Sequence, residues 1–153
     1  MNLPPGCELL LCRFADQATG LREVRGRVFI DEQQVPQEEE WDDRDPHCVH
    51  ALLRCDGEAI ACGRLDLQPG APQQGKIGRV AVLAPWRNHG LGVQIMQALE
   101  AEAIRSGLQS TWLYAQVSAL GFYERLGYSG EGERFMEAGI EHLAMRKNLT
   151  PAH

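Results

Sequence analysis

Apolar and β-branched stretches alternate along the chain with segments of helical periodicity, which predicts a mixed succession of strands and helices. Asp56-Gly57 separates two of the apolar stretches and predicts a two-residue hairpin turn between antiparallel strands. Residues 68–75 are rich in proline and glycine and are predicted as a loop. The predicted strands are residues 8–14, 47–55, 58–67, 76–83, 110–116 and 140–147.

Helices are predicted between these strands. In the first, Leu21, Val24 and Val28 lie three and four residues apart and form one apolar face. The second starts near Leu91, has an apolar residue at every fourth position and ends at Gly107, and a short one covers residues 119–126. This order of elements predicts an α/β (α+β) fold, a mixed sheet with helices on its faces.

Length, hydropathy and charge narrow the class of protein. A length of 153 residues indicates a single domain spanning residues 1–153. No apolar run approaches the ~20 residues of a membrane helix, and the first residues lack the basic segment of a secretory signal, so we expect a cytoplasmic protein with no membrane partner. Fifteen basic and 21 acidic residues give a net charge of −6, which disfavours nucleic acid as a partner.

The cysteines are Cys7, Cys12, Cys48, Cys55 and Cys62. Their number is odd and none forms a Cys-x-x-Cys pair, which argues against a disulfide framework and against a zinc site. We therefore expect small buried thiols in strands, and no bound metal.

Residues 38–45 contain six acidic side chains, and the two other residues of the run are Trp41 and Arg44. A run of this kind is typical of a solvated loop or a short helix. The alternative is that it attracts a cationic acceptor to a nearby site.

The segment 79–93 has the most informative pattern: a strand, a turn, then Gly90 and Gly92 at the start of a long helix. The first amides of a helix lack intrahelical partners and carry partial positive charge, and glycines let a backbone approach an anion closely. The glycines fit a phosphate site and a tight turn without ligand equally well. Gly-Lys-Ser/Thr is absent, which excludes a P-loop, and Ile95 and Trp112 stand where a dinucleotide fingerprint needs a glycine and, about 20 residues further on, an acid.

Two segments resemble the GNAT superfamily of N-acetyltransferases. Arg87-x-x-Gly90-x-Gly92, after a Val-Ala-Val strand, resembles the acetyl-CoA-binding signature of that family. Residues 121–128 (Gly-Phe-Tyr-Glu-Arg-Leu-Gly-Tyr) resemble its Phe-Tyr-x-x-x-Gly-Phe segment, at the expected distance and in the expected order.

The resemblance extends over nearly the whole chain from the first helix onward. The segments that resemble the ElaA-like branch of the family are the acidic run and residues 25–33, 115–116 and 137–142. This implies a mostly antiparallel central sheet flanked by helices on both faces, and transfer of an acetyl group from acetyl-CoA to a primary amine by direct attack while both substrates are bound.

The resemblance also assigns the co-substrate site. A strand backbone would pair with the pantetheine arm, turn amides would hold the pyrophosphate, and a glutamine stands where many members have asparagine near the CoA arm. The positions concerned are Val80, Ala81, Val82, Arg87, Asn88, His89, Gly90, Leu91, Gly92, Val93 and Gln116.

For proton transfer, the resemblance implies that Tyr123 protonates the departing CoA thiolate; packing of the short helix is the alternative role for this ring. Strand 76–83 has no glutamate, although many relatives have one there. The candidates for the general base are therefore Glu32, His50, Glu137 and His142, with Glu137 expected in a loop, and a water chain to solvent would serve equally well. Glu32 and Glu137 are expected first of all to contact the acceptor.

Other classes of function stay open. A CoA-binding sensor or partner protein would keep Arg87 and the glycines without needing Tyr123, and a plain nucleotide-binding module would use the same anion turn. The acceptor is a small-molecule amine by default, and the sequence leaves open its identity, the length of the acyl group and whether the chain forms a homodimer, as many family members do.

Overall fold

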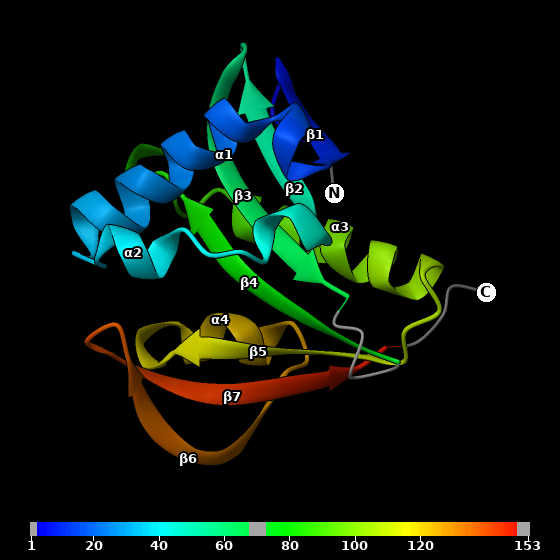
Figure 1. Ribbon diagram of the computed structural model, residues 1–153. Helices are drawn as coiled ribbons and strands as arrows, with labels where there is room; N and C mark the ends of the chain where they lie inside the picture. The colour runs from blue at the N-terminus through cyan, green and yellow to red at the C-terminus, as the bar shows by residue number, and fades with distance from the viewer. Residues whose placement is uncertain (1–2, 68–72, 150–153) are drawn as a thin grey trace.

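The computed structural model describes residues 3–67 and 73–149, which form one sheet with helices on both faces (Figure 1). The sheet has seven strands in the order β1-β2-β3-β4-β5-β7-β6, and every neighbouring pair is antiparallel except β4 and β5. This confirms the predicted mixed, mostly antiparallel sheet. The strands are β1 (Cys7–Cys12), β2 (Cys48–Cys55), β3 (Glu58–Asp66), β4 (Gln74–Val82), β5 (Ser110–Gln116), β6 (Ser129–Glu137) and β7 (Ile140–Asn148).

The predicted apolar helix faces are confirmed by burial. Leu21 and Val24 of the first helix are fully buried, as are Ile95 and Leu99 of the long helix. None of the helices in the described parts of the chain is long and apolar enough to cross a membrane. The helices are α1 (Ala18–Arg25), which continues in wider π-helical turns as η2 (Gly26–Glu32), α2 (Gln37–Glu40), α3 (Leu91–Arg105) and α4 (Leu120–Arg125).

Strand β6 was not predicted. Its sequence, Ser-Gly-Glu-Gly-Glu-Arg-Phe-Met-Glu, lacks an apolar face because the strand is an edge strand that pairs only with β7 and is exposed along most of its length. The predicted loop 68–75 lies mostly outside the described residues, and its last two positions already belong to β4.

The expectation of unpaired thiols is wrong for two of the cysteines. Cys7 and Cys55 face each other in the β1–β2 register and form a disulfide. The pair lies 48 residues apart in the chain, so only the strand register brings the two thiols together. Cys12, Cys48 and Cys62 are free, and the last two are buried as expected.

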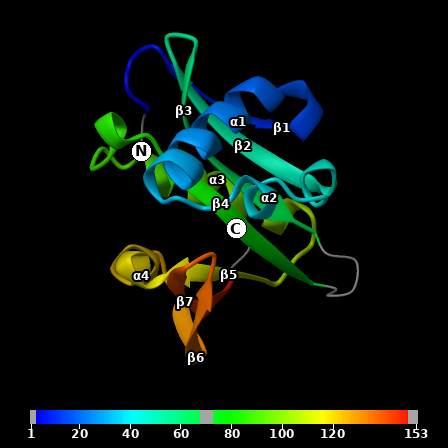
Figure 2. The same ribbon diagram turned by 60° about the vertical axis from the view of Figure 1, so that its left-hand side comes forward.

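Strands β4 and β5 diverge soon after they begin. Their parallel pairing covers three positions, the last being Lys76 opposite Trp112. Beyond Lys76 the edge of β4 that faces β5 has no strand partner within the described sheet. Figures 1 and 2 show the result: β5, β6 and β7 turn away from β1 to β4, and a gap opens between the two parts.

A β-bulge interrupts β4 next to this gap. Gly78 pairs with Arg64 and Ala81 with Cys62, so Arg79 and Val80 together oppose the single residue Gly63 of β3. Arg79 has a positive φ of 55°. The bulge turns the Arg79 side chain toward α2, where it meets carboxylates.

These carboxylates belong to an arginine–carboxylate cluster that connects α1 and α2 to β3 and β4. Four arginines meet four acids, so the formal charges cancel. The ion pairs within the cluster are Arg25–Glu40 (2.7 Å), Arg25–Asp45 (2.8 Å), Arg64–Asp42 (2.7 Å), Arg64–Asp45 (2.8 Å), Arg79–Glu40 (3.1 Å), Arg79–Asp42 (3.3 Å) and Arg44–Asp66 (2.7 Å).

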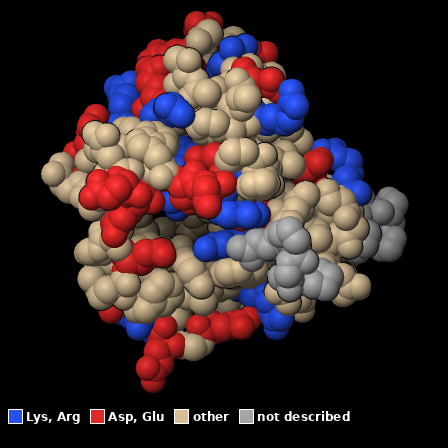
Figure 3. Space-filling model, in the orientation of Figure 1, with Lys and Arg blue, Asp and Glu red and all other residues tan. Residues whose placement is uncertain are grey.

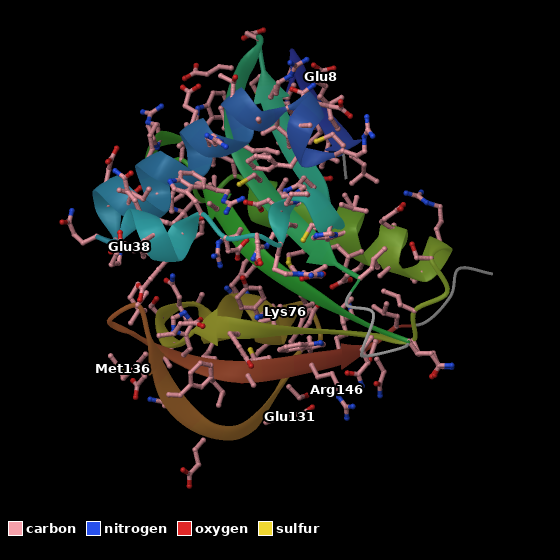
Figure 4. All side chains as sticks on the ribbon, viewed as in Figure 1. Glu8, Glu38, Lys76, Glu131, Met136 and Arg146 are labelled. Atoms are coloured by element: carbon pink, nitrogen blue, oxygen red, sulfur yellow. A yellow bond between two sulfur atoms is a disulfide. The ribbon has the colours of Figure 1, made fainter. Side chains whose placement is uncertain are left out.

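The acidic run is therefore not a solvated loop. Glu40 and Asp45 are only 3% and 4% exposed. Burying a carboxylate is strongly unfavourable unless cations and hydrogen bonds compensate, and the arginines that do so come from distant parts of the sequence. Only part of the run is exposed as expected, including Glu38, which Figure 4 shows on the outer side of α2.

We predict that Asp45→Asn destabilises the fold by about 3–5 kcal/mol, because Arg25 and Arg64 each lose one of two carboxylate partners and the buried cluster keeps one positive charge without a counter-charge. The measurement is the free energy of unfolding in urea. The matched control is Asp16→Asn, which removes the exposed Arg13–Asp16 pair and should change stability by less than about 1 kcal/mol. Equal losses in the two variants would contradict the prediction.

Candidate active site

A cavity of about 500 Å³ lies along the gap between β4 and β5, on the side of the sheet that carries α2. Figure 3 shows the hollow, with Lys and Arg atoms inside it and Asp and Glu atoms gathered near its edge. The residues lining it include Phe29, Gln33, Glu39, Glu40, Asp42, Arg44, Arg64, Asp66, Lys76, Gly78, Arg79, Val80, Tyr114, Gln116, Tyr123, Glu137 and His142.

Three of the predicted catalytic residues line this one cavity: Tyr123 from α4, Glu137 from the end of β6 and His142 from β7. Glu137 lies in a strand and not in the expected loop, because β6 extends to the turn before β7. Burial raises the pKa of the Tyr123 hydroxyl to about 12. The phenol therefore keeps its proton throughout the neutral and mildly alkaline range.

His142 has a defined orientation. Its ring stacks on Phe135, with centroids 5.8 Å apart, and Nδ1 lies 2.7 Å from the carbonyl oxygen of Ile140. A carbonyl oxygen can only accept, so Nδ1 carries a hydrogen and donates it. In the neutral ring Nε2 is then the nitrogen that can take up a proton.

Gln116 also lines the cavity, at the end of β5. Its side-chain amide donates to Gln33 Oε1 over 2.8 Å, and the Gln33 amide returns a hydrogen bond over 3.3 Å. The pair links β5 to the end of η2 across the mouth of the gap.

The other two candidates for the base lie elsewhere. His50 is 1% exposed, with Nε2 3.0 Å from the carbonyl oxygen of Asp45 and its ring against Phe14. Asp45 lies against the ring, His50 does not line the cavity, and burial lowers its pKa. Glu32 does not line the cavity either; it pairs with Arg87 at 2.7 Å.

Arg87 is thus held by protein groups. Its Nε donates to the carbonyl oxygen of Val82 over 2.9 Å, and its two terminal nitrogens donate to the Glu32 carboxylate over 3.0 and 2.7 Å. The arginine ties the end of β4 to the end of η2.

The turn from β4 into α3 has the predicted strand–turn–helix form. Gly90 precedes α3 with a φ of 76°, a left-handed conformation that glycine adopts without strain. The amides of residues 88–93 make no backbone hydrogen bond to the described parts of the chain, and no side chain caps the helix. A Cβ on Gly92 would lie 3.1 Å from Cζ of Phe122, so a hydrogen atom here lets α3 approach α4.

The backbone of Val82 faces the gap. The amide of Leu83 donates to the carbonyl oxygen of Ile60 on β3 over 2.9 Å. Because peptide groups along a strand point alternately to its two sides, the N–H and C=O of Val82 point away from β3, and the Arg87 contact with the Val82 carbonyl agrees with this.

A comparison with models of known protein families identifies the family of this chain. The model of the acetyltransferase (GNAT) family matches residues 18–128, which is most of the chain. The chain belongs to the acetyltransferase (GNAT) family.

Individual GNAT relatives agree with this. An uncharacterized N-acetyltransferase of Bacillus subtilis, YjcF, is 38% identical over 126 residues, which cover 82% of this chain and 88% of YjcF. An acyl-CoA N-acyltransferase from Pseudomonas aeruginosa has the same fold with a TM-score of 0.83 and 30% identity, over 92% of this chain and 99% of that one.

Escherichia coli ElaA superposes with a TM-score of 0.83 at 24% identity, over 92% of this chain and 99% of ElaA. The expected ElaA-like GNAT fold is confirmed. Membership of the family makes the chain an acyltransferase that uses a CoA-linked acyl donor.

Sequence reasoning missed several charged residues of this cavity. Lys76, Arg64, Arg79 and Asp66 line the cavity, but they lie in strands whose pattern only indicated burial. The available signal for these residues was the presence of a charged side chain within an otherwise apolar strand. Across residues 3–67 and 73–149, no group of three or more His, Cys, Asp or Glu side chains is arranged to hold a metal ion.

Proposed function

We propose that this GNAT protein transfers an acetyl group from acetyl-CoA to a primary amine, with both substrates bound at once. The observation that carries the proposal is the free edge of β4, which runs beside the cavity that holds Tyr123 and leads through residues 83–90 to the uncapped start of α3. One elongated donor can then lie with its diphosphate at the helix and its thioester in the gap.

The residues present fit such a donor. Amides of residues 88–93 are available for the pyrophosphate, where the positive end of the α3 dipole favours an anion. The backbone of Val80, Ala81 and Val82 would run beside the pantetheine arm, and Gln116 lies on the opposite side of the gap. For the Arg87 charge to reach the phosphates, its ion pair with Glu32 would have to break.

Bound acetyl-CoA supplies an activated thioester. The Val82 N–H, which points into the gap, donates a hydrogen bond to the thioester oxygen as negative charge develops there. One preorganised donor of this kind lowers a barrier by about 3–4 kcal/mol.

Tyr123 supplies the proton for the leaving thiolate. Its pKa of about 12 keeps the phenol protonated but makes it a weaker acid than free tyrosine. A thiol has a pKa of about 8.5 in water, and desolvation in the same gap raises it, which narrows the difference between the two groups.

His142 accepts the proton of the attacking amine at Nε2. It lines the cavity together with Tyr123, and its Nδ1 is committed to Ile140. Glu137 lines the same cavity and is the alternative base.

The donor site is tested by calorimetric titration with CoA, ATP and NAD. We expect CoA to bind and ATP and NAD to bind at least about tenfold more weakly, because only CoA fills the gap as well as the helix start. Equal affinities would indicate a plain nucleotide-binding module.

We predict that Tyr123→Phe lowers kcat for thiol release from acetyl-CoA by about 10²-fold or more, with unchanged affinity for CoA. The control is Tyr128→Phe, which removes a hydroxyl bound to Thr111 (2.7 Å) and Glu100 (2.9 Å) away from the cavity. This control should lose stability and keep kcat. A normal kcat in Tyr123→Phe would remove Tyr123 from the acid role, and an absence of thiol release with every amine would favour the CoA sensor.

For the base, His142→Gln should lower kcat by about 10²-fold or more, while Glu137→Gln should change it by less than about tenfold. The glutamine at residue 142 retains a polar side chain of similar reach but cannot take up a proton. The pH profile of kcat for both variants and the wild type is the measurement. The reverse order of effects would assign the role to Glu137.

A further inference from the structure

One cation in the cavity differs from all the others. The cavity-lining arginines Arg44, Arg64 and Arg79 each belong to the arginine–carboxylate cluster, in which four guanidinium groups face four carboxylates. The ammonium group of Lys76 makes no ion pair and no hydrogen bond with residues 3–67 or 73–149, although Lys76 lines the same cavity.

The acid nearest in register is already committed. Asp66 of β3 pairs with Lys76 across the strands. Both oxygens of Asp66, however, accept hydrogen bonds from Arg44, over 2.8 and 2.7 Å. Glu137 and Asp66 are the acids whose fields act on Lys76, and Arg64 and Arg79 oppose them.

Aromatic rings hold the Lys76 ammonium group in position. Nζ lies 4.3 Å from the ring centre of Tyr114 and 5.1 Å from that of Trp112, both on β5. Figure 4 shows Lys76 between β4 and β5, at the closed end of the gap. Burial lowers the pKa of Lys76, as expected for a cation with incomplete compensation, and an anion beside it would reverse that effect.

The same cavity contains unpaired negative charge. Glu39 and Glu137 line it, and neither carboxylate forms an ion pair with a described residue. A ligand that complements both signs of charge has a cationic end and an anionic end.

We propose that the acceptor is an amine that carries a carboxylate, and that this carboxylate binds Lys76 while the amine points toward Tyr123 and His142. The inference rests on the proposed function, since it names the substrate class of that reaction. A single unpaired cation matches a monoanion; a phosphate dianion would meet repulsion from Asp66 and Glu137 without a second free cation.

The span of the acceptor follows from β4. A strand rises about 3.3 Å per residue, so the Cα atoms of Lys76 and Val82, whose N–H faces the thioester, are separated by at most roughly 20 Å along the strand. Part of this distance is covered by the lysine side chain. The test therefore needs amino acids of several lengths.

The experiment measures thiol release from acetyl-CoA with matched acceptor pairs: glycine and methylamine, 4-aminobutyrate and propylamine, 6-aminohexanoate and pentylamine. We expect at least one acid to exceed its partner about 10- to 100-fold in kcat/KM, as a charge-assisted contact allows. Lys76→Met should reduce that ratio at least about tenfold, and Lys76→Arg should retain most of it. The control is Arg134→Met on β6, outside the cavity, which should keep the wild-type ratio.

Several outcomes would overturn the proposal: no preference for any acid, a preference that survives Lys76→Met, or a Lys76-dependent preference for O-phosphoethanolamine over all the acids.

Calorimetric titration of the CoA-bound protein with N-acetyl-4-aminobutyrate and N-acetyl-6-aminohexanoate separates this proposal from the proposed reaction. Binding that needs Lys76, without turnover of any amine, would refute acetyl transfer and keep the carboxylate site. Turnover of simple amines, without preference for an acid, would support acetyl transfer and refute the carboxylate site.

Discussion

The arginine–carboxylate cluster is the interaction on which the site depends. It holds α2 and residues 41–47 against β3 and β4, so that Glu40 and Asp42 cover the bulge at Arg79. Charges buried in this way are tolerated only when each has its counter-charge, which fixes the position of the whole segment. Within the cluster the guanidinium and carboxylate charges balance, so the unpaired ammonium group of Lys76 is chemically distinctive.

A second polar network connects the two parts of the sheet through α3. Glu100 of α3 accepts hydrogen bonds from Tyr128 over 2.9 Å and from Lys147 over 2.8 Å. These contacts fasten β7 and the segment before β6 to α3, which also packs on β2, β3 and β4. Both parts of the sheet are thus anchored to one helix, and β4 and β5 need only a short pairing with each other.

Contacts from both sides of the gap meet at the end of η2. Arg87 contacts the Val82 carbonyl beside the expected path of the donor and pairs with Glu32 of η2. One residue further on, Gln33 exchanges hydrogen bonds with Gln116 at the cavity. A shift of η2 would therefore change contacts on both sides of the gap.

The sequence by itself determined the fold class, the helix faces and the glycine turn before α3, because periodicity and glycine conformation act over a few neighbouring residues. It also indicated Tyr123 through a local motif. Tertiary structure decided what depends on strand register and on partners far away in the chain. The Cys7–Cys55 disulfide, the burial of Glu40 and Asp45 and the isolation of Lys76 are of this kind, since whether a thiol or a charge is paired is a property of its neighbours in space.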